Sequence, residues 1–491
     1  MSTFRYDLIG SAINRAYSLI DTRIHNNNIH TEFEFQKQTV LADKTLTNDE
    51  QNEAVRLLTK NYDRNKIIDN EGTKRICEDC NQECLATLYC EICVHNYLKE
   101  NFSNWSSGND DIDNLIKKCQ MESFMPDMII EWISYSDLQD VEYLTKGGCS
   151  EIYTAIWISG RYDQWNSKNQ QLKRKGNIKV VLKKLENVEN ASQSWFEEAK
   201  SHLTISNKRA EVVRCYGLTK DPSDGNYMLV IMRMNINLRE YLQQNHNQLT
   251  WKERINIAYS IINNLSYIHK ENAIHRDLHS GNILYSQLND YWYIADLGFC
   301  GPVDKPLRSV YGNLPYIAPE VIAENQTTFA SDVYSIAILM WEISSGQVPF
   351  VDYERDYYLA TNIINGIRPK IVQGTPLEYE SLMKQCWDAD PLKRIDSNTL
   401  KDKIGEIHLH YQNESNELFQ SYINDNSNIS NNTNSSRLLS KVYQLENFSV
   451  PRNATEEEQE AFHSKPYDFD IPDDINDFDK SINTNKLLQK E

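Results

Sequence analysis

The segment His275-Arg276-Asp277-Leu278-His279-Ser280-Gly281-Asn282 carries the strongest chemical signal in the sequence. Within it a carboxylate, Asp277, and an amide, Asn282, stand five residues apart. Phosphoryl transfer needs a carboxylate that orients an attacking hydroxyl and accepts its proton, and an amide oxygen that holds magnesium. Fourteen residues after Asn282 comes Asp296-Leu297-Gly298, which offers a second metal-binding carboxylate. The pattern therefore predicts a magnesium-dependent phosphoryl-transfer site.

A further motif follows at the expected distance, Pro315-Tyr316-Ile317-Ala318-Pro319-Glu320. Together these segments match, in order and spacing, the motifs H-R-D-L-x-x-x-N, D-x-G and A-P-E. From about Glu142 to about Arg394 the chain thus resembles a eukaryotic protein kinase domain. Two later segments, Asp332-Val333-Tyr334-Ser335 followed by Trp341-Glu342, and Gln385-Cys386-Trp387-Asp388-x-x-Pro391-x-x-Arg394, look like the tyrosine-kinase-like group. The resemblance implies an α+β, bilobal fold within residues 137–410. A small antiparallel-sheet lobe with one helix and a large helical lobe would enclose ATP and Mg²⁺.

The resemblance extends upstream to Val180-Val181-Leu182-Lys183, which stands where the family has V-A-I-K. Alternation along a strand puts Val181 and Lys183 on one face, toward the nucleotide. There the resemblance implies that Lys183 contacts the α- and β-phosphates. The helical candidate SQSWFEEAKSHL offers Glu198 as the ion-pair partner of this lysine. Glu197 is the alternative, because one residue turns a helix by about 100°.

The predicted nucleotide pocket begins at Leu144-Thr145-Lys146-Gly147-Gly148-Cys149-Ser150. This segment aligns with a glycine-rich loop but keeps only the middle glycine, Gly147, which would let the backbone approach the phosphates. Tyr227–Met234 resembles the strand and hinge that hold the adenine base. The resemblance assigns the following residues to the pocket: Leu144, Gly147, Ile152, Val181, Lys183, Ile231, Met232, Met234 and Leu284.

The large lobe shows two helical patterns. Apolar residues recur every three or four positions in one set, which predicts an amphipathic helix: Ile255, Ala258, Ile262, Leu265 and Ile268. Val333–Ile343 is apolar nearly all round, which indicates a helix buried on every side. By resemblance, Asp332 supports the backbone of the catalytic loop, and Glu320 forms a buried ion pair with Arg394. These three residues are expected to be structural.

The preferred acceptor hydroxyl is inferred from the catalytic and substrate-binding loops. Serine/threonine kinases usually carry a lysine two residues after the catalytic aspartate, where this chain has His279. Tyrosine kinases usually place an arginine in that loop, and this chain has none there. Gly312–Tyr316 resembles the serine/threonine pattern, which favours serine and threonine over tyrosine. Arg276 would order the segment around a phosphorylated Ser309 or Tyr311, and the alternative is that these are ordinary loop residues.

Two functions are compatible with these motifs. The favoured interpretation is an active, ATP-dependent protein kinase in intracellular signalling, because Lys183, Asp277, Asn282 and Asp296 are all present. The alternative is a pseudokinase scaffold or adaptor that binds nucleotide or partners without turnover. The altered glycine-rich loop and His279 motivate that alternative.

Six candidate metal ligands lie close together in the sequence: Cys77, Cys80, Cys90, Cys93, Cys84 and His95. The first four form two C-x-x-C pairs, which can face each other and close a tetrahedral Zn²⁺ site. These four thiolates are preferred, and Cys84 or His95 are substitutes. A packed cluster of free thiols is the alternative. With four protein ligands a bound zinc would be structural, and the module would mediate contacts.

Composition limits the other interpretations. The chain has 51 Lys and Arg against 70 Asp and Glu, a net charge of −19, which disfavours nucleic acid as a partner. It holds no run of about 18 apolar residues that could span a bilayer. Its first residues lack the pattern of a secretory signal. We therefore expect a cytoplasmic protein. The resemblance to protein kinases implies that its substrates are proteins.

At 491 residues the chain is expected to contain several units. Residues 1–75 are polar with a helix at Asp49–Tyr62. The last part is rich in Asn, Ser and acidic residues, whose low hydrophobicity does not offset the entropy of ordering, so we expect it to be largely disordered. Partners could bind it or the cysteine-rich module. The predicted units are an N-terminal region (1–75), a cysteine-rich module (76–97), a linker (98–136), the kinase-like domain (137–410) and an acidic tail (411–491).

Overall fold

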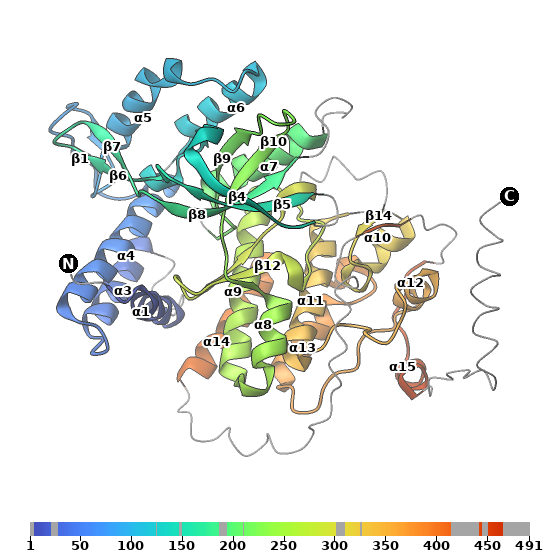
Figure 1. The fold of residues 1–491 in the computed structure, drawn as a ribbon. Helices are drawn as coiled ribbons and strands as arrows, with labels where there is room; N and C mark the ends of the chain where they lie inside the picture. The colour runs from blue at the N-terminus through green and yellow to red at the C-terminus, as the bar shows by residue number, and fades with distance from the viewer. Residues whose placement is uncertain are drawn as a thin grey trace.

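The structure, a computed structural model, describes residues 4–20, 28–123, 125–146, 150–185, 194–209, 211–300, 310–324, 327–413, 441–443 and 450–464. These residues form an N-terminal helical region, a cysteine-rich module, a sheet-containing small lobe and a helical large lobe (Figure 1). The predicted α+β, bilobal organisation is confirmed.

A six-stranded sheet forms the small lobe, in the order β3-β9-β10-β8-β5-β4. Its strands are β3 (Glu131–Trp132), β4 (Leu138–Lys146), β5 (Glu151–Trp157), β8 (Ile178–Lys184), β9 (Cys215–Lys220) and β10 (Tyr227–Met232). Neighbouring strands are antiparallel except β3, which runs parallel to β9. In β8, Val180 and Leu182 are completely buried, so Val181 and Lys183 lie on the opposite face, toward the large lobe.

Two of the described helices pack on this sheet: the single helix expected in the small lobe, and a second helix from outside the predicted kinase-like domain. The first is α7 (Ser194–Lys208), and the second is α6 (Asp110–Met121), which lies in the segment predicted to be a linker. The linker prediction was wrong because this segment has an apolar stripe at helical spacing that buries against the small lobe. The stripe consists of Ile112, Leu115, Ile116 and Cys119. A short 3₁₀ turn, η2 (Pro126–Met128), and β3 complete the connection.

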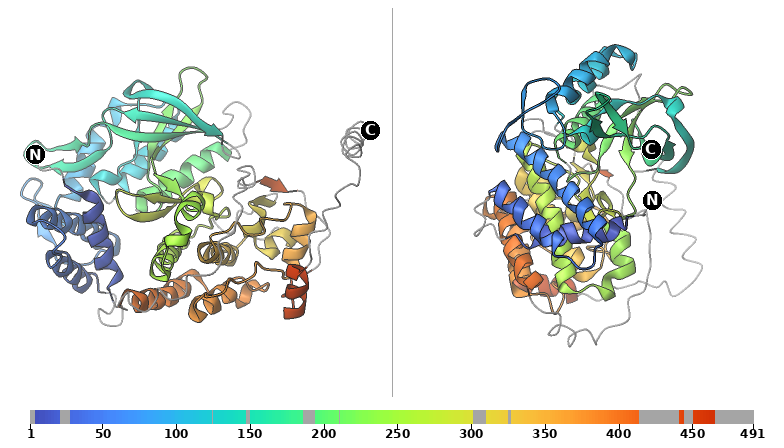
Figure 2. Two further views of the ribbon diagram at one scale, coloured as in Figure 1. Left: turned by 60° about the horizontal axis from the view of Figure 1, so that its bottom comes forward. Right: turned by 90° about the vertical axis from the view of Figure 1, so that its left-hand side faces the viewer.

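In the described part of the N-terminal region three helices pack together: α1 (Tyr6–Ser18), α3 (Ile29–Leu41) and α4 (Asn48–Asp69). The helix predicted at Asp49–Tyr62 lies within α4, which begins at a capping box formed by Thr47 and Glu50. Figure 2 shows these helices beside the large lobe, where α1 contacts α14. Ser11 Oγ of α1 donates a hydrogen bond of 2.9 Å to Asp290 Oδ2. This region therefore packs against the large lobe.

The cysteine-rich module contains a two-stranded ladder of β1 (Arg75–Ile76) and β2 (Glu83–Cys84), followed by α5 (Glu91–Glu100) and η1 (Phe102–Asn104). Val94 and Leu98 of α5 share a core with Met125 and Met128, next to the small lobe. The hairpin of β6 (Tyr162–Asn166) and β7 (Gln171–Arg174) joins this core. The module is thus packed onto the small lobe.

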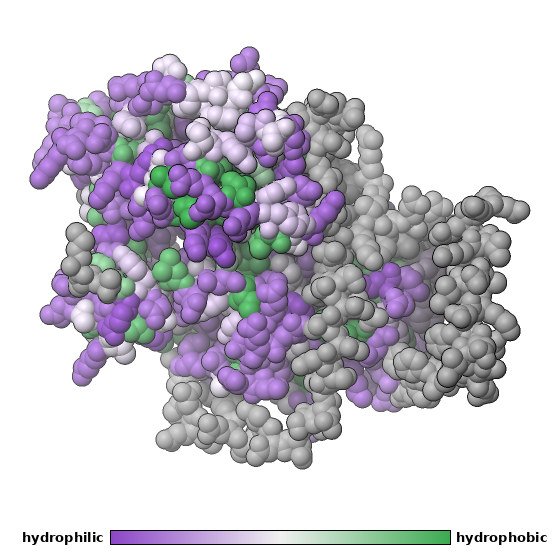
Figure 3. Space-filling view, viewed as in Figure 1, coloured by the Kyte–Doolittle hydropathy of each residue, from purple (hydrophilic) through white to green (hydrophobic). Residues whose placement is uncertain are grey.

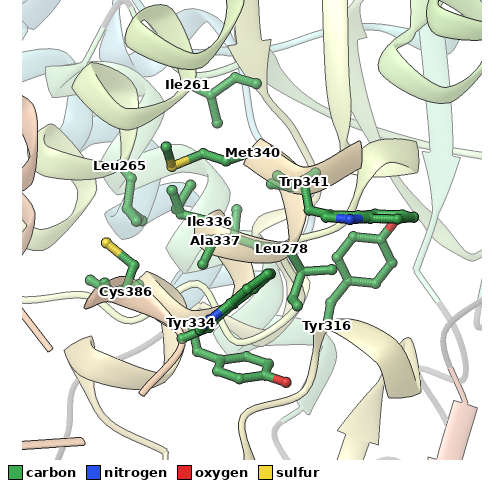
Figure 4. Packing of buried hydrophobic residues seen from close by; sticks show 14 of the residues in the cluster. Ile261, Leu265, Leu278, Tyr316, Tyr334, Ile336, Ala337, Met340, Trp341 and Cys386 are labelled. Atoms are coloured by element: carbon green, nitrogen blue, oxygen red, sulfur yellow. The ribbon is translucent and has the colours of Figure 1, made fainter. Parts of the chain in front are cut away.

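The large lobe is built around α11 (Phe329–Ser345), of which every residue from Ser331 onward is buried. The prediction of a helix buried on every side is confirmed, and Figure 4 shows Tyr334, Ile336 and Met340 packed among neighbouring helices. The predicted amphipathic helix is α9 (Trp251–Lys270). The other elements are α8 (Leu238–Asn245), α10 (Pro319–Glu324), α12 (Tyr357–Ile364), α13 (Leu377–Cys386), α14 (Ser397–Asn413), β11 (Ile236–Asn237), β12 (Ile283–Ser286) and β13 (Tyr291–Ile294), with the 3₁₀ turns η3 (Tyr135–Asp137), η4 (His246–Gln248), η5 (Ser280–Asn282), η6 (Leu297–Phe299), η7 (Leu314–Tyr316) and η8 (Pro391–Lys393).

Two segments of the predicted disordered tail are folded, which corrects that prediction for these residues. The short strand β15 (Lys441–Tyr443) pairs antiparallel with β14 (Val310–Gly312). The helix α15 (Glu456–Ser464) docks on the large lobe, where Phe462 is 6% exposed and stacks on Tyr353. One buried aromatic ring and several backbone hydrogen bonds stabilise a segment whose average composition is polar.

Hydrophilic residues cover most of the described surface on the face shown in Figure 3, and hydrophobic residues appear only in small patches. Among the described residues, no helix is both long enough and apolar enough to cross a membrane.

Candidate active site

Three charged groups from both lobes meet at the cleft. Lys183 Nζ of β8 lies 2.8 Å from Glu198 Oε1 of α7 and 2.7 Å from Asp296 Oδ1 of the large lobe. Burial alone would lower the pKa of Lys183, but the two carboxylates raise it overall. Burial likewise opposes ionisation of Asp296, yet Lys183 lowers the pKa of this carboxyl well below its usual range. Both groups are therefore charged at neutral pH.

The geometry distinguishes between the two candidate glutamates on α7. Glu198 contacts Lys183, as predicted, whereas Glu197 lies 3.6 Å from Lys200 on the surface. One residue of helical rotation separates the two side chains. Gly298 follows Asp296 and leaves room for this arrangement, because a Cβ there would lie 3.1 Å from Glu198 Oε1.

The catalytic loop is held by a buried carboxylate beneath it. Asp332 Oδ2 accepts a hydrogen bond of 2.7 Å from the His275 backbone N–H, and Oδ1 accepts one of 3.0 Å from Arg276 N–H. Asn282 Nδ2 donates to the carbonyl oxygen of Asp277 at 2.9 Å. That bond orients the amide, so its oxygen is the end that can bind a metal. The supporting role expected for Asp332 is thus seen in its contacts.

Backbone strain occurs at Asp296, whose φ of 59° is rare for a residue other than glycine. Several contacts hold this conformation. His275 Nε2 donates to the Ala295 carbonyl at 2.9 Å, and Gly298 N–H donates to Asp296 Oδ1 at 3.3 Å. Strained residues that persist in this way cluster at functional sites.

A cavity of about 340 Å³ separates the lobes beside these charges. The predicted pocket residues Ile152, Val181, Lys183, Ile231, Met232, Met234 and Leu284 all line it. Leu144 was also predicted to line it, but its side chain is 56% exposed and lies outside the described lining. A register shift between Tyr143 and Thr145 changes the direction of this strand end. Gly147 lies outside the described residues, so its prediction is untested.

Sequence reasoning missed several lining residues, of which His202 is the most informative. It lies one turn after Glu198 on α7 and is 4% exposed. Burial lowers its pKa to about 3, so the ring is neutral at physiological pH. The spacing of four residues from Glu198 was the available signal. Other missed lining residues are Val213, Asn235, Ile236, Asn237, Ile294 and Ala295.

His279 occupies the position where serine/threonine kinases usually carry a lysine. Its Nε2 lies 3.9 Å from Asp277 Oδ1. Burial lowers the pKa of His279 to about 4, so this side chain is uncharged at neutral pH. It can therefore form hydrogen bonds beside Asp277 but does not supply the positive charge of a lysine.

Asp277 lies beside Gly312 of β14 and does not line the main cavity. A Cβ on Gly312 would lie 3.4 Å from Asp277 Oδ1. A smaller cavity of about 20 Å³ is lined by Asp277, Gly312 and Asn313. Of the two proposed phosphorylation sites, Ser309 lies outside the described residues, and Tyr311 belongs to β14.

Glu320 and Arg394 form the expected buried ion pair in the large lobe. Arg394 donates two hydrogen bonds of 2.7 Å to the two carboxylate oxygens of Glu320. The guanidinium side chain is 0% exposed. This bidentate pair fixes the start of α10.

The paired cysteines converge in space. Their four Sγ atoms lie within 4.8 Å of one another, with Cys77 to Cys93 at 3.8 Å and Cys80 to Cys90 at 3.7 Å. With metal–sulfur bonds of about 2.3 Å, the corners of a tetrahedron stand about 3.8 Å apart. The donor set therefore fits zinc.

The two substitute ligands do not join this group. Cys84 instead groups with Cys90 and Glu91. His95 Nε2 donates to the Ser123 carbonyl at 3.2 Å. The four paired cysteines are thus the better ligand set.

Comparison with known proteins supports the resemblance. A family model described as "Protein tyrosine and serine/threonine kinase" matches residues 138–404, more than half of the chain. The chain is 26% identical over 288 residues to "Probable serine/threonine-protein kinase roco7" of Dictyostelium discoideum, covering 56% of this chain and 10% of that protein. It is 35% identical over 150 residues to the human "Dual serine/threonine and tyrosine protein kinase", covering 30% of this chain and 16% of that protein.

A third relative, "Probable serine/threonine-protein kinase pats1" of Dictyostelium discoideum, is 25% identical over 289 residues, covering 56% of this chain and 9% of that protein. The matches therefore span only about a tenth of the length of these Dictyostelium relatives.

Proposed function

Because this chain belongs to the protein tyrosine and serine/threonine kinase family, we propose that it transfers the γ-phosphoryl group of ATP to hydroxyls of protein substrates. The observation that carries the proposal is the contact of Lys183 with both Glu198 and Asp296 across the cleft. Such a contact brings a cation and a metal-binding carboxylate to one place, where terminal phosphates would lie.

Each residue has a distinct task in this proposal. The cavity between the lobes takes ATP, with Lys183 held by Glu198 against the phosphates. Asp296 and the amide oxygen of Asn282 would hold Mg²⁺, which neutralises phosphate charge when bound. Asp277 orients the acceptor hydroxyl and takes up its proton. Since Asp277 lies beside Gly312, the protein substrate enters along that segment.

Serine and threonine are the favoured acceptors. The Dictyostelium relatives carry serine/threonine-protein kinase in their names, and the relative with dual specificity leaves tyrosine as the second acceptor. A peptide array with serine, threonine or tyrosine at one central position would measure this preference directly. Incorporation into tyrosine alone would contradict it.

We place this activity in the cytoplasm. The nine described cysteines form no disulfide with one another, which suits a reducing compartment. Imaging of a fluorescent fusion of the full chain would test this placement. Fluorescence confined to a secretory organelle would exclude it.

An active kinase is favoured over a scaffold without turnover. A scaffold needs no charged network across the cleft, yet here the pKa of Lys183 is raised and that of Asp296 lowered by their mutual contact. The neutral His279 does not exclude catalysis, because a Mg²⁺ held by Asp296 and Asn282 would supply positive charge at the phosphates.

Catalysis can be tested with labelled ATP, magnesium and a generic protein substrate. We expect Asp277→Asn to lower kcat by about a hundredfold or more, because it removes the general base. The matched control is Asp402→Asn, which changes an exposed aspartate on α14 in the same way and should leave kcat unchanged. Equal incorporation by wild type and Asp277→Asn would exclude the proposed role of Asp277.

We also propose a structural zinc ion bound by Cys77, Cys80, Cys90 and Cys93. Four thiolates at tetrahedral spacing support it. When bound, zinc would hold β1, β2 and the start of α5 together. The module would then be a rigid platform on the small lobe, suited to contacts with partner proteins.

Metal analysis of the purified full chain in reducing buffer would test the zinc proposal. We expect one zinc per chain, and its loss in Cys77→Ser. The matched control Cys84→Ser should keep the metal, because Cys84 lies outside the group of four. A wild-type chain without stoichiometric zinc would reject the site.

A further inference from the structure

Helix α7, which carries Glu198, is packed on a helix from outside the kinase domain. The apolar stripe of α6 forms one core with Ala199 and Leu203 of α7. Both α7 residues are 0% exposed, as are Ile112 and Ile116 of α6. Residues 199 and 203 lie about 100° around the helix from Glu198 and His202, which line the cleft. The rotation of α7 about its axis is therefore set by what α6 covers.

Polar contacts tie the ends of the two helices together. The last four carbonyls of a helix have no partner within it. Asn207 Nδ2 of α7 donates to one of these in α6, the Cys119 carbonyl, at 2.8 Å. Arg214 Nη1 donates to one in α7, the Ser206 carbonyl, at 3.1 Å. Its Nη2 donates at 3.0 Å to the carbonyl of Asp127, which follows α6. These bonds fix α7 along its axis as well.

The cleft side of α7 is held equally closely. Ser201 Oγ donates to the Cys300 carbonyl at 2.9 Å. Gly298 lies so near Glu198 that a Cβ there would be 3.1 Å from its carboxylate. α7 is thus confined between α6 on one side and the segment after Asp296 on the other. Small movements of α6 would change the distance from Glu198 to Lys183, now 2.8 Å.

The cysteine-rich module supports α6 from behind. Val94 and Leu98 of α5 pack with Met125 and Met128, which follow α6. His95 Nε2 bonds the Ser123 carbonyl at 3.2 Å. The contacts are therefore continuous from the cysteine-rich module through Ser123, Met125 and Met128 to α6 and α7. Such a chain of packed groups can carry coupling between two sites.

We propose that α6 and the described residues on either side of it, 105–123 and 125–133, form a built-in brace that positions Glu198, and with it Lys183, for phosphoryl transfer. The brace rests on the proposed function, since positioning matters only if the cleft is catalytic. Ile116 and its neighbours on α6 are then positioning residues, because they affect the reaction only through α7. The kinase domain alone, residues 138–404, would then lack part of what sets its active geometry.

The brace can be tested in the full chain by a double-mutant cycle. Ile116→Ala removes side-chain packing from the α6 stripe and should lower kcat about tenfold, with KM for the protein substrate unchanged. In a Glu198→Gln background the same change should lower kcat less than about twofold, because the contact it positions is already lost. Lys118→Ala is the control on α6, since its side chain is 71% exposed, and it should leave kcat unchanged.

The brace proposal would be overturned if Ile116→Ala kept the wild-type kcat. It would also be overturned if the loss of kcat in the variant carrying both Ile116→Ala and Glu198→Gln equalled the product of the two single losses. The milder Ile116→Val replaces Ile116→Ala if the latter does not give a single cooperative melting transition.

Amide hydrogen exchange gives a readout independent of catalysis. Ile116→Ala should speed exchange in α7 while leaving α9 of the large lobe unchanged. Unchanged exchange in α7 would also overturn the brace. If wild type itself transfers no phosphate, the proposed function fails and hydrogen exchange alone decides whether α6 holds α7.

Discussion

The absence of a side chain at Gly298 leaves room for the carboxylates of Asp296 and Glu198, which both contact Lys183. A Cβ there would lie 3.1 Å from both Asp296 Oδ1 and Glu198 Oε1. We expect Gly298→Ala to push these carboxylates apart and lower kcat between about tenfold and about a hundredfold. The control Gly405→Ala adds a methyl on α14 at an ordinary 3.5 Å from Tyr259 and should leave kcat unchanged. Steady-state kinetics on both variants would check this, and equal kcat values would contradict it.

Arg394 shows what a buried charge contributes to stability. Its side chain is 0% exposed and holds both oxygens of Glu320. We expect Arg394→Ala to lower the free energy of unfolding by about 3–5 kcal/mol, because Glu320 would be left buried without its partner. Lys393→Ala, next in sequence but 66% exposed, should change it by less than about 0.5 kcal/mol. Urea denaturation measures both, and a loss below about 1 kcal/mol for Arg394→Ala would be inconsistent with this account.

Among the elements, α15 depends on close backbone contact with the large lobe. Arg452 N–H donates to the Ile364 carbonyl at 3.0 Å, and Gln459 Nε2 donates to the Gly366 carbonyl at 2.7 Å. Gly366 has a φ of 92°, and a Cβ on it would lie only 2.1 Å from the Ala454 nitrogen. The docking site therefore tolerates no side chain at this position.

We accordingly expect Gly366→Ala to release residues 450–464 and to speed tryptic cleavage after Arg452. Gly374→Ala is the matched control, because Gly374 has a similar φ of 86° but no atom within 4 Å of its Cβ position. It bears the backbone strain alone and should keep the tail docked. Mass spectrometry of timed digests distinguishes them. Identical cleavage rates in the two variants would show that the crowding is unimportant.

For the whole molecule, buried histidines link stability to pH. Burial lowers the pKa of His202 to about 3 and those of His279 and His408 to about 4. In the unfolded chain each would titrate near 6.5. Between these values the unfolded chain binds protons that the folded chain does not, so stability is present above about pH 6.5 and falls as pH drops toward 4.

For each such histidine, the free energy of unfolding should fall by up to about 1.4 kcal/mol per pH unit as the pH drops through that window. His408 is suited to a test because it lies far from the cleft, stacked on Tyr259 and next to Asn256. We expect His408→Gln to flatten the fall in unfolding free energy between pH 6 and pH 5. His410→Gln, at an exposed position nearby, should follow wild type. Parallel curves for His408→Gln and wild type in urea titrations would refute the linkage.

Local pattern was enough to predict the two-lobed kinase fold, the buried helix α11 and the residues around the cleft. These could be predicted because the residue types of the motifs, with Asp277, Asn282 and Asp296 among them, recur in the order and spacing of the family, which can be read directly from the sequence. The two C-x-x-C pairs were likewise predicted from local spacing, and their sulfur atoms come together at the separation expected for zinc ligands.

Tertiary structure decided what depends on contacts between distant residues. It placed Glu198, the predicted partner, against Lys183 and the alternative Glu197 near Lys200, because the rotation of α7 against its neighbours directs the two side chains differently. Tertiary contacts also explain why the expected linker contains the packed helix α6, why Leu144 lies outside the cleft lining, and why α15 packs on the large lobe. Tertiary structure also made His279 neutral, because burial, which no local motif reports, sets that pKa. Side chains far apart in the sequence determine packing and desolvation, and these appear only once the chain is folded.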